Sequence, residues 1–378
     1  ETRMPHLIVF SHLRWNFVYQ RPQHLMSRFA RERRVFFIEE PVWEEAQQTP
    51  FLEVEHPLAS LTRVVPHIPQ GLPSDRVEEV QRQLLAELFL EHSIDEPLLW
   101  FYTPMALGWL PDVDPHVVIY DVMDELSLFL APPPGLLERE AQLFEWADVV
   151  FTGGPSLYEC KRSRHANVHC FPSSIDRAHF IQARNGIAEP EDQRRLPAPR
   201  LGFFGVLDER MDLDLLAGLA EARPDWQLVM VGPIVKIDPA LLPQAPNLHY
   251  LGMKPYAELP AYLAGWDVAL MPFARNAATR FISPTKTPEY LAGGVPVVST
   301  SIRDVERLYG HSGLIQIADT VPDVVEAVDR AMTQRHDAHW LRQVDKLLSH
   351  SSWDTTWASM ERQLQPLLRG FPQGDPIF

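Results

Sequence analysis

The stretch from residue 283 to residue 298 joins a helix start, a short helix, a glycine stop and an apolar strand. Ser283 has a hydroxyl that can cap the helix, and Pro284 suits the first helical position because it has no N–H group to leave unpaired. The glycines at 293 and 294 end the helix, and the run from 296 to 300 continues as a buried strand. Such a unit is typical of sheets that are covered by helices.

The start of this helix predicts a binding site for an anion. Free N–H groups and the positive end of the helix dipole attract negative charge there, and Lys286 adds a full charge. Ser283 and Thr285 bring hydroxyl groups to the same end. Glu289 lies one turn after Lys286 on the same helical face, where a carboxylate can accept hydrogen bonds from two ribose hydroxyls. We therefore interpret this helix as a nucleotide site, with an ordinary amphipathic helix as the alternative.

Apolar strand runs and helix signals alternate along most of the 378 residues. This alternation predicts an α/β fold with doubly wound parallel sheets, and the length suits two or three domains. The expected strands lie at 6–10, 35–38, 61–65, 98–103, 116–121, 148–154, 167–172, 200–207, 225–232, 247–252, 267–273 and 296–300. The expected helices lie at 21–33, 74–92, 258–265, 284–292, 302–309, 321–349 and 352–368.

Two motifs resemble one enzyme family. Residues 283–298 resemble the donor-binding helix of retaining glycosyltransferases with two Rossmann-like domains, the family-4 or glycosyl transferases group 1 type. The subgroup motif runs Ser-Pro-x-Lys-x-x-Glu-Tyr-Leu-Ala-x-Gly-x-Pro-Val-Val, and residues 10–25 resemble the opening segment of the same bacterial subgroup. Two positions depart from the family pattern: Phe281 stands where many members carry an acidic residue, and Val206 stands where an Arg is usual.

The resemblance implies two Rossmann-like domains that face each other across a cleft, the GT-B arrangement. We expect an acceptor-side domain at 1–186 and a donor domain at 200–350. Between them we expect a linker at 187–199, which is rich in Pro, Glu and Arg. The last segment, 351–378, is expected to form a helix that crosses back onto the first domain.

The resemblance also points to a site residue at the end of the strand at 116–121, where open α/β sheets have their chemistry. Asp121 matches a family residue that lines the active site near the donor sugar, so we expect a catalytic role for it. Capping of the next turn is one alternative. A metal site shared with Asp124 and Glu125 is another, but this family usually manages diphosphate charge with cations, so we expect no metal and no other cofactor.

The family pattern assigns further roles along the cleft. Arg210 and Lys286 are expected to neutralise the donor diphosphate, and Arg275 or Arg280 is a candidate for an additional charge. The base of the nucleotide is expected next to Gly252, Met253 and Lys254. The acceptor is expected next to His12, Arg14 and Trp15.

The function implied by the resemblance is transfer of a sugar, with retention, from a nucleoside diphosphate-sugar to an acceptor hydroxyl by a hexosyltransferase. The acceptor is a saccharide or a lipid-linked molecule, as in bacterial surface-polysaccharide or glycolipid assembly. A sugar-nucleotide epimerase of the same architecture is one alternative. A nucleotide-sugar-binding protein without turnover is the other, because the acidic residue expected at position 281 is missing.

The composition limits the kinds of partner and the cellular location that we expect. A net charge of −16 argues against nucleic acid, and no apolar run approaches the roughly 18 residues of a spanning helix. Cys160 and Cys170 make neither a disulfide framework nor a metal site, and no secretory signal is evident, so we expect a cytoplasmic protein. Residues 12–34 hold six arginines against one glutamate, which predicts peripheral contact with an anionic membrane or a solvated helix face.

Overall fold

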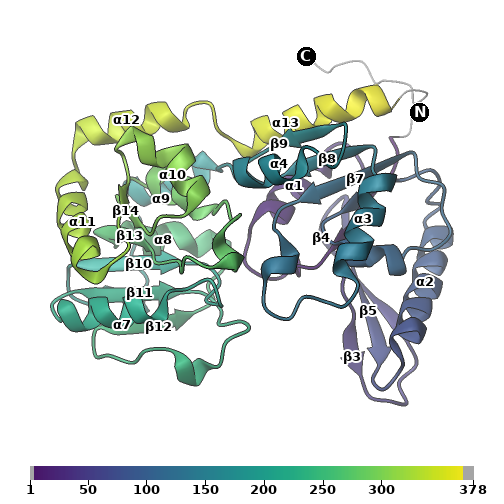
Figure 1. Cartoon of the computed structure of the whole chain (residues 1–378), viewed down its shortest axis with the longest axis horizontal. Coiled ribbons are helices and arrows are strands. Elements are labelled where there is room, and N and C mark those ends of the chain that lie inside the picture. Colours follow the sequence, from purple (N-terminus) through teal and green to yellow (C-terminus); the bar gives the residue numbers. More distant parts are fainter. Residues whose placement is uncertain (1–3, 369–378) are drawn as a thin grey trace.

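The computed structural model describes residues 4–368, which form two α/β domains around two separate sheets (Figure 1). The strands of the first sheet are β1 (Leu7–Ser11), β2 (Val35–Glu39), β3 (Val42–Glu44), β4 (Phe51–Leu58), β5 (Leu61–Pro69), β6 (Leu98–Phe101), β7 (Val117–Val122), β8 (Val149–Thr152) and β9 (Val168–Cys170). The strands of the second are β10 (Arg200–Phe204), β11 (Gln227–Val231), β12 (Leu248–Gly252), β13 (Val268–Met271), β14 (Val297–Ser299) and β15 (Gln316–Ile317).

Both sheets have the strand order of doubly wound folds. The first runs β3-β5-β2-β1-β6-β7-β8-β9, with β4 paired to β5, and the second runs β12-β11-β10-β13-β14-β15. Neighbouring strands are parallel, and the central ones are apolar runs that are buried on both faces. The exception is β4, which is antiparallel to β5. The prediction of an α/β fold with two parallel-sheet domains is confirmed, apart from this edge strand.

Helices cover the faces of both sheets (Figure 1). They are α1 (Arg21–Phe29), α2 (Ser74–Glu91), α3 (Leu136–Trp146), α4 (Pro155–Lys161), α5 (Arg177–Phe180), α6 (Glu191–Arg194), α7 (Leu213–Ala222), α8 (Leu259–Ala264), α9 (Lys286–Ala292), α10 (Arg303–Tyr309), α11 (Val321–Gln334), α12 (Ala338–Leu348) and α13 (Trp353–Leu364). Short 3-10 turns lie at Pro104–Gly108, Leu126–Leu128, Ile181–Arg184, Pro239–Leu241, Tyr256–Glu258, Ala277–Thr279, Gly310–Ser312 and Gln365–Leu367.

The last helix, α13, leaves the second domain and packs on the first, as predicted (Figure 1). Its buried side chains Trp353, Met360 and Leu364 belong to the same apolar core as Leu7 and Phe29 of the first domain. The tail after residue 368 lies outside the described residues.

The segment between the two sheets is packed against the second domain. Phe180 and Ala183 join the core of that domain. Gln193, within the predicted linker, is buried; its Oε1 accepts a hydrogen bond from Trp266 Nε1 (2.8 Å) and its Nε2 donates to the carbonyl oxygen of Tyr262 (2.9 Å). The domain boundaries drawn from the sequence stay a prediction.

Five of the six arginines of residues 12–34 bind carboxylates of the same chain, which corrects the interpretation as a solvated helix face. Arg28 and Arg31 both contact Asp354 of α13, at 2.8 and 3.1 Å. Arg33 pairs with Glu361 of the same helix. Half of this local charge therefore joins α1 and the following turn to the C-terminal helix. No helix within residues 4–368 is long and apolar enough to cross a membrane.

Candidate functional site

The helix of the predicted nucleotide site, α9, begins at Lys286 and is shorter than expected. Its N-cap residue Thr285 makes no capping hydrogen bond through its side chain. Ser283 lies in the preceding loop, and its carbonyl oxygen accepts a hydrogen bond from Ser173 Oγ of the first domain (2.6 Å). The predicted capping by Ser283 is therefore wrong, because this residue joins the two domains. Pro288 also removes one free N–H group from the first turn, so attraction for an anion rests mainly on charged side chains.

Lys286 occupies a space that Gly205 leaves open, and Gly232 in turn leaves room for the backbone of Gly205. A β-carbon at Gly205 would overlap Cε of Lys286, and one at Gly232 would overlap the carbonyl oxygen of Gly205. The two glycines follow the neighbouring strands β10 and β11 and have φ angles of +142° and +153°. Nζ of Lys286 lies 5.4 Å from the ring centre of Phe203. Burial and the nearby Arg210 lower the pKa of Lys286, so an anion beside it would relieve an unfavourable charge.

Glu289 faces a small cavity of about 60 Å³. The residue is 3% exposed, and this burial raises the pKa of its carboxyl group, whereas Lys286 opposes the rise. The cavity is lined by Phe17, Val18, Tyr19, Phe204, Gly205, Val231, Gly232, Pro233, Met253, Lys254, Pro255, Tyr256, Leu259, Thr285, Lys286 and Glu289. A carboxylate and a cation on one side, with apolar and aromatic walls on the other, suit a nucleoside with its phosphates.

The residues expected beside the base divide into two groups. Met253 and Lys254 lie in the wall of the Glu289 cavity, and Nζ of Lys254 also pairs with Asp192 (2.8 Å). Gly252 is not part of that wall. Its carbonyl oxygen accepts a hydrogen bond from the N–H of Gly232 (2.9 Å), and its φ of +78° forms the turn that leads to Met253.

A second cavity of about 60 Å³ lies between the domains on the other side of Lys286. It is lined by Gln20, Arg21, Met123, Asp124, Gly153, Ser173, Arg210, Phe273, Ile282, Ser283, Pro284, Thr285 and Lys286. Asp124 is the acidic residue among those that line this cavity. Burial raises its pKa to about 6, and Asp208 adds to the rise, while Arg210 opposes it. The sequence placed Asp124 in the tail of a strand but gave no reason to prefer it over its neighbours.

Asp121 is not in the wall of this cavity. Its carboxylate is fully buried and held by Arg21, whose Nε and Nη2 donate to its two oxygens at 3.0 and 2.8 Å. Arg21 is the cavity residue of the pair, so the expectation that Asp121 lines the sugar site is corrected. The shared metal site is not formed either, since Glu125 pairs with Lys161 (2.5 Å) and no metal-binding group of His, Cys, Asp and Glu occurs within residues 4–368.

Arg210 faces the cleft, between the small interdomain cavity and a larger one, and lines both. Its Nε donates to Asp208 Oδ1 (3.0 Å), and its Cζ lies 5.9 Å from the ring centre of Phe129 in the first domain. In the described part of the chain, Arg275 and Arg280 are outside the walls of these cavities. Of the cations expected to neutralise the diphosphate, Arg210 and Lys286 are therefore the two that lie in the cavity walls.

The larger interdomain cavity has a volume of about 440 Å³. It is lined by His12, Leu13, Phe17, Gln20, Glu40, Thr103, Asp124, Leu126, Phe129, Leu130, Ala131, Pro132, Pro133, Val206, Asp208, Arg210, Val235 and Lys236. His12 lies in this wall, where burial and Lys236 lower its pKa to about 4. The imidazole is therefore neutral at physiological pH, so one ring nitrogen can donate a hydrogen bond to a ligand and the other can accept one.

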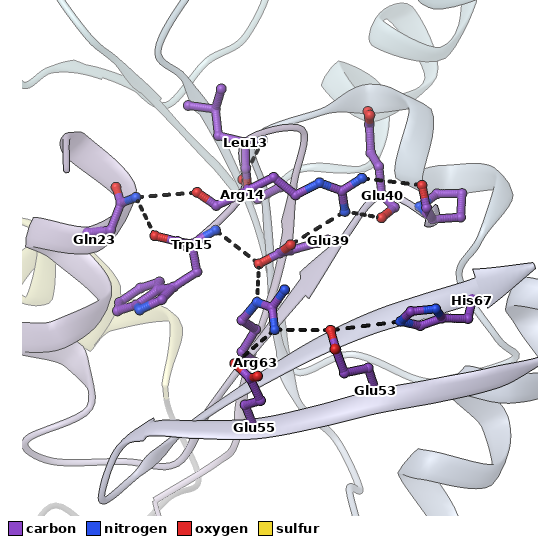
Figure 2. A network of polar contacts seen from close by, with 12 residues as sticks. Leu13, Arg14, Trp15, Gln23, Glu39, Glu40, Glu53, Glu55, Arg63 and His67 are labelled. Carbon is purple, nitrogen blue, oxygen red and sulfur yellow. Dashed lines mark hydrogen bonds and ion pairs between the residues drawn. The ribbon is translucent and has the colours of Figure 1, made fainter. Parts of the chain in front are cut away.

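Arg14 and Trp15 are not in the wall of that cavity, contrary to expectation. Both reach Glu39 of the neighbouring strand instead (Figure 2). Nη1 of Arg14 contacts Glu39 Oε1 (3.4 Å) and the carbonyl oxygen of Glu40. The N–H of Trp15 donates to Glu39 Oε2 (2.9 Å), and its ring packs edge-on against Phe37. These residues support the loop that carries His12 and do not face the cleft.

The second domain also matches known proteins in sequence. Residues 198–334 match the family model described as Glycosyl transferases group 1. The second domain therefore resembles group 1 glycosyltransferases over most of its length. A Bacillus subtilis protein, TuaH, a glycosyltransferase assigned to teichuronic acid biosynthesis, is 24% identical over 179 residues, which cover 46% of this chain and 42% of that protein. The match thus spans less than half of the relative's length.

Solved structures align with both domains of the chain at once. Sucrose-phosphate synthase from Thermosynechococcus elongatus has a TM-score of 0.69 at 13% identity, over 96% of this chain and 99% of that one. A UDP-forming trehalose-phosphate synthase from Burkholderia xenovorans has a TM-score of 0.67 at 12% identity, over 96% and 99%. These similarities confirm the two-domain GT-B fold.

Proposed function

We propose that this chain transfers a sugar from a nucleoside diphosphate-sugar to an acceptor hydroxyl in the cleft between its domains. The observation that carries the proposal is the joint placement of Lys286 and Glu289. One short helix presents a cation beside Gly205 and a buried carboxylate towards a cavity with aromatic walls. The family match of residues 198–334 supports the same assignment.

Each part of the donor has a chemical counterpart in this proposal. Glu289 accepts hydrogen bonds from the ribose hydroxyls, and the base lies along Met253 and Lys254. Lys286 and Arg210 bind the diphosphate, so its charge is met by protein cations without a cofactor. The transferred sugar lies in the small interdomain cavity beside Asp124, whose raised pKa allows it to hold or accept a proton near neutral pH.

The reaction breaks the bond between the anomeric carbon and the phosphate oxygen and forms a bond from that carbon to the acceptor oxygen. The acceptor's proton goes to the departing nucleoside diphosphate. Negative charge develops on the leaving phosphate, and Lys286 and Arg210 stabilise it most at that point. We propose retention of configuration, with the acceptor attacking the face from which the phosphate leaves.

We also propose a cytoplasmic role in bacterial surface-polysaccharide or glycolipid assembly, with a hexose as the transferred sugar. The similarity to the TuaH protein supports this setting. Peripheral membrane contact is a weaker prediction, because Arg28, Arg31 and Arg33 are paired with α13. Sedimentation with anionic and with neutral liposomes at low salt tests it, and equally poor sedimentation with both would contradict it.

Calorimetric titration with UDP, GDP, dTDP and ADP tests the donor site. One of the nucleotides should bind the wild type, and Glu289→Ala should weaken binding by about 1.5–3 kcal/mol, as expected for lost hydrogen bonds to a charged group. Glu258→Ala is the matched control, since Glu258 is exposed next to the same loop but outside the cavity wall. Absence of binding at millimolar concentration would overturn the proposal.

Incubation of the matching nucleotide-sugar with candidate acceptors separates the remaining alternatives. A glycosylated acceptor shows a transferase, and NMR of its anomeric proton gives the stereochemistry. Conversion of the donor to an isomer would show an epimerase. Binding without either product would show a protein that binds nucleotide-sugars without turnover.

A further inference from the structure

The larger interdomain cavity has both polar and apolar lining residues. Three of the polar ones, Gln20, Asp124 and Arg210, also line the small cavity beside Lys286. The second domain contributes Val206 and Val235 to the apolar wall. The first domain contributes one loop to that wall, through Leu126, Phe129, Leu130, Ala131, Pro132 and Pro133.

This apolar loop is fixed to the opposite domain. The N–H of Leu130 donates to both carboxylate oxygens of Glu209, at 2.8 and 3.1 Å. The ring centre of Phe129 lies 5.9 Å from Cζ of Arg210 and 5.7 Å from Nζ of Lys236, within the range of cation–π attraction. These contacts cross the cleft, so the apolar wall is a defined surface of the closed arrangement.

Val206 extends this wall on the side of the second domain. The family pattern has an Arg at this position, whereas Val206 here lies in the same cavity wall as Phe129 and Val235. A guanidinium there would bring a hydrated charge to the wall. Leu130 is 61% exposed at the same wall, so its side chain is accessible to a ligand.

We propose that the acceptor is amphipathic, with an alkyl chain that lies along this loop and a hydroxyl that reaches Asp124 and Arg210. The inference rests on the proposed transferase function and names its acceptor class. An alkyl chain fits better than an aromatic group, because the loop residues beside Phe129 and the facing Val206 and Val235 are aliphatic, and Phe129 already faces two cations. A cavity of about 440 Å³ falls within the roughly 300–1,000 Å³ that suit a small ligand of this kind.

The test compares octyl with methyl β-glycosides of glucose, galactose, mannose and N-acetylglucosamine, kept below the micellar concentration. Binding is measured by calorimetry on the full chain with saturating UDP and also without nucleotide. At least one octyl glycoside should bind about tenfold or more tightly than its methyl counterpart, since burial of only a few methylene groups accounts for such a ratio. Leu130→Ser and Val206→Thr should each reduce this ratio several-fold.

Leu137→Ser is the matched control, because Leu137 on α3 is 64% exposed and lies outside the cavity wall. It should leave the octyl-to-methyl ratio unchanged. The proposal is overturned if no octyl glycoside binds, if octyl and methyl forms bind equally, or if Leu137→Ser lowers the ratio as much as Leu130→Ser does. An octyl preference without nucleotide binding would support the apolar site and contradict the donor site, so the two proposals fail separately.

Discussion

A β-carbon at position 205 would lie 2.7 Å from Nζ of Lys286 and would overlap its Cε, so Gly205 leaves the space that this lysine fills. The glycine ends a strand of the second sheet, and the lysine begins α9 more than eighty residues later. A missing side chain on one element thus sets the position of a charged side chain on another. The role of Lys286 in the proposed diphosphate site depends on this fit.

Gly205→Ala should therefore displace the ammonium group of Lys286. We expect nucleotide affinity to fall by about 1.5–3 kcal/mol, the usual range for losing a hydrogen bond to a charged group. Titration with the nucleotide that binds the wild type measures the loss. Because φ at this position is +142°, the substitution also strains the backbone, and circular dichroism should verify that the variant remains folded.

A double-mutant cycle shows whether Gly205→Ala acts through the lysine. If it does, the substitution should cost little further affinity when Lys286→Ala is already present. Additive losses would contradict the proposed link between the two residues. Gly310→Ala is the control, because a β-carbon there would make ordinary contacts of 3.5 Å or more.

The buried pair Arg21–Asp121 gives a prediction about stability. Both side chains are almost fully enclosed, at 3% and 0% exposure, so Asp121→Asn leaves an uncompensated cation. We expect the free energy of unfolding to fall by about 3–5 kcal/mol, as measured by urea denaturation. Replacing both residues, Arg21→Met with Asp121→Leu, should recover much of the loss. A single substitution that leaves stability unchanged but abolishes transfer would instead restore a catalytic role for Asp121.

Local patterns sufficed to predict most strands, most helices and the residues that share one helix. Lys286 and Glu289 are one turn apart, so their joint placement follows from helical geometry. The pairing of Arg21 with Asp121 joins residues from α1 and β7, and no local pattern reveals which carboxylate a buried arginine takes. The close packing of Gly205 and Gly232 could not be predicted either. Each is a single glycine after a strand, and their contact follows only once the two strands are known to be neighbours.

The features that the sequence did not predict have different physical causes. Most residues of β4 are exposed, so it carries no strong apolar signal, and its antiparallel pairing with β5 was not predicted. Arg14 and Trp15 were expected in the cleft because loops at the carboxyl ends of strands usually face it. The carboxylate of Glu39, on the next strand, attracts both residues towards the sheet instead.

Asp124 should make stability depend on pH in a definite direction. Its pKa is raised from 3.8 to about 6 in the folded protein, so between these values the folded state binds a proton that the unfolded chain has lost. Stability therefore falls as the pH rises from about 4 to about 6. Because Asp124 is only partly buried, we expect about 1–2 kcal/mol from it. Urea denaturation at several pH values measures the slope.

Asp124→Asn should remove this contribution to the slope, because an amide does not titrate in that range. Asp112→Asn is the control, since Asp112 is exposed and lies outside the cavity walls. Equal slopes for the wild type and Asp124→Asn would contradict the raised pKa. They would also remove the argument that this carboxyl group can hold a proton beside the transferred sugar.

Glu39 is the centre of the polar network that holds the first loop (Figure 2). Its fully buried carboxylate accepts hydrogen bonds from Arg63 Nε (3.0 Å) and from the N–H of Trp15 (2.9 Å). Glu53 binds the same arginine at 3.1 Å but is 40% exposed. Glu39→Gln should lower the free energy of unfolding by about 3–5 kcal/mol, whereas Glu53→Gln should cost less than about 1 kcal/mol.

The same pair of variants tests whether the network fixes the loop that carries His12. In Glu39→Gln a neutral amide oxygen replaces the carboxylate and accepts a weaker hydrogen bond from the N–H of Trp15, so this N–H should exchange its hydrogen faster. Glu53→Gln should leave that exchange rate unchanged, because Glu53 reaches only Arg63 and His67. If acceptor binding weakens in Glu39→Gln while nucleotide binding persists, the network supports the acceptor side of the cleft alone. Equal weakening of both would mean that the first loop also supports the donor site, through Phe17 and Tyr19 in the wall of the Glu289 cavity.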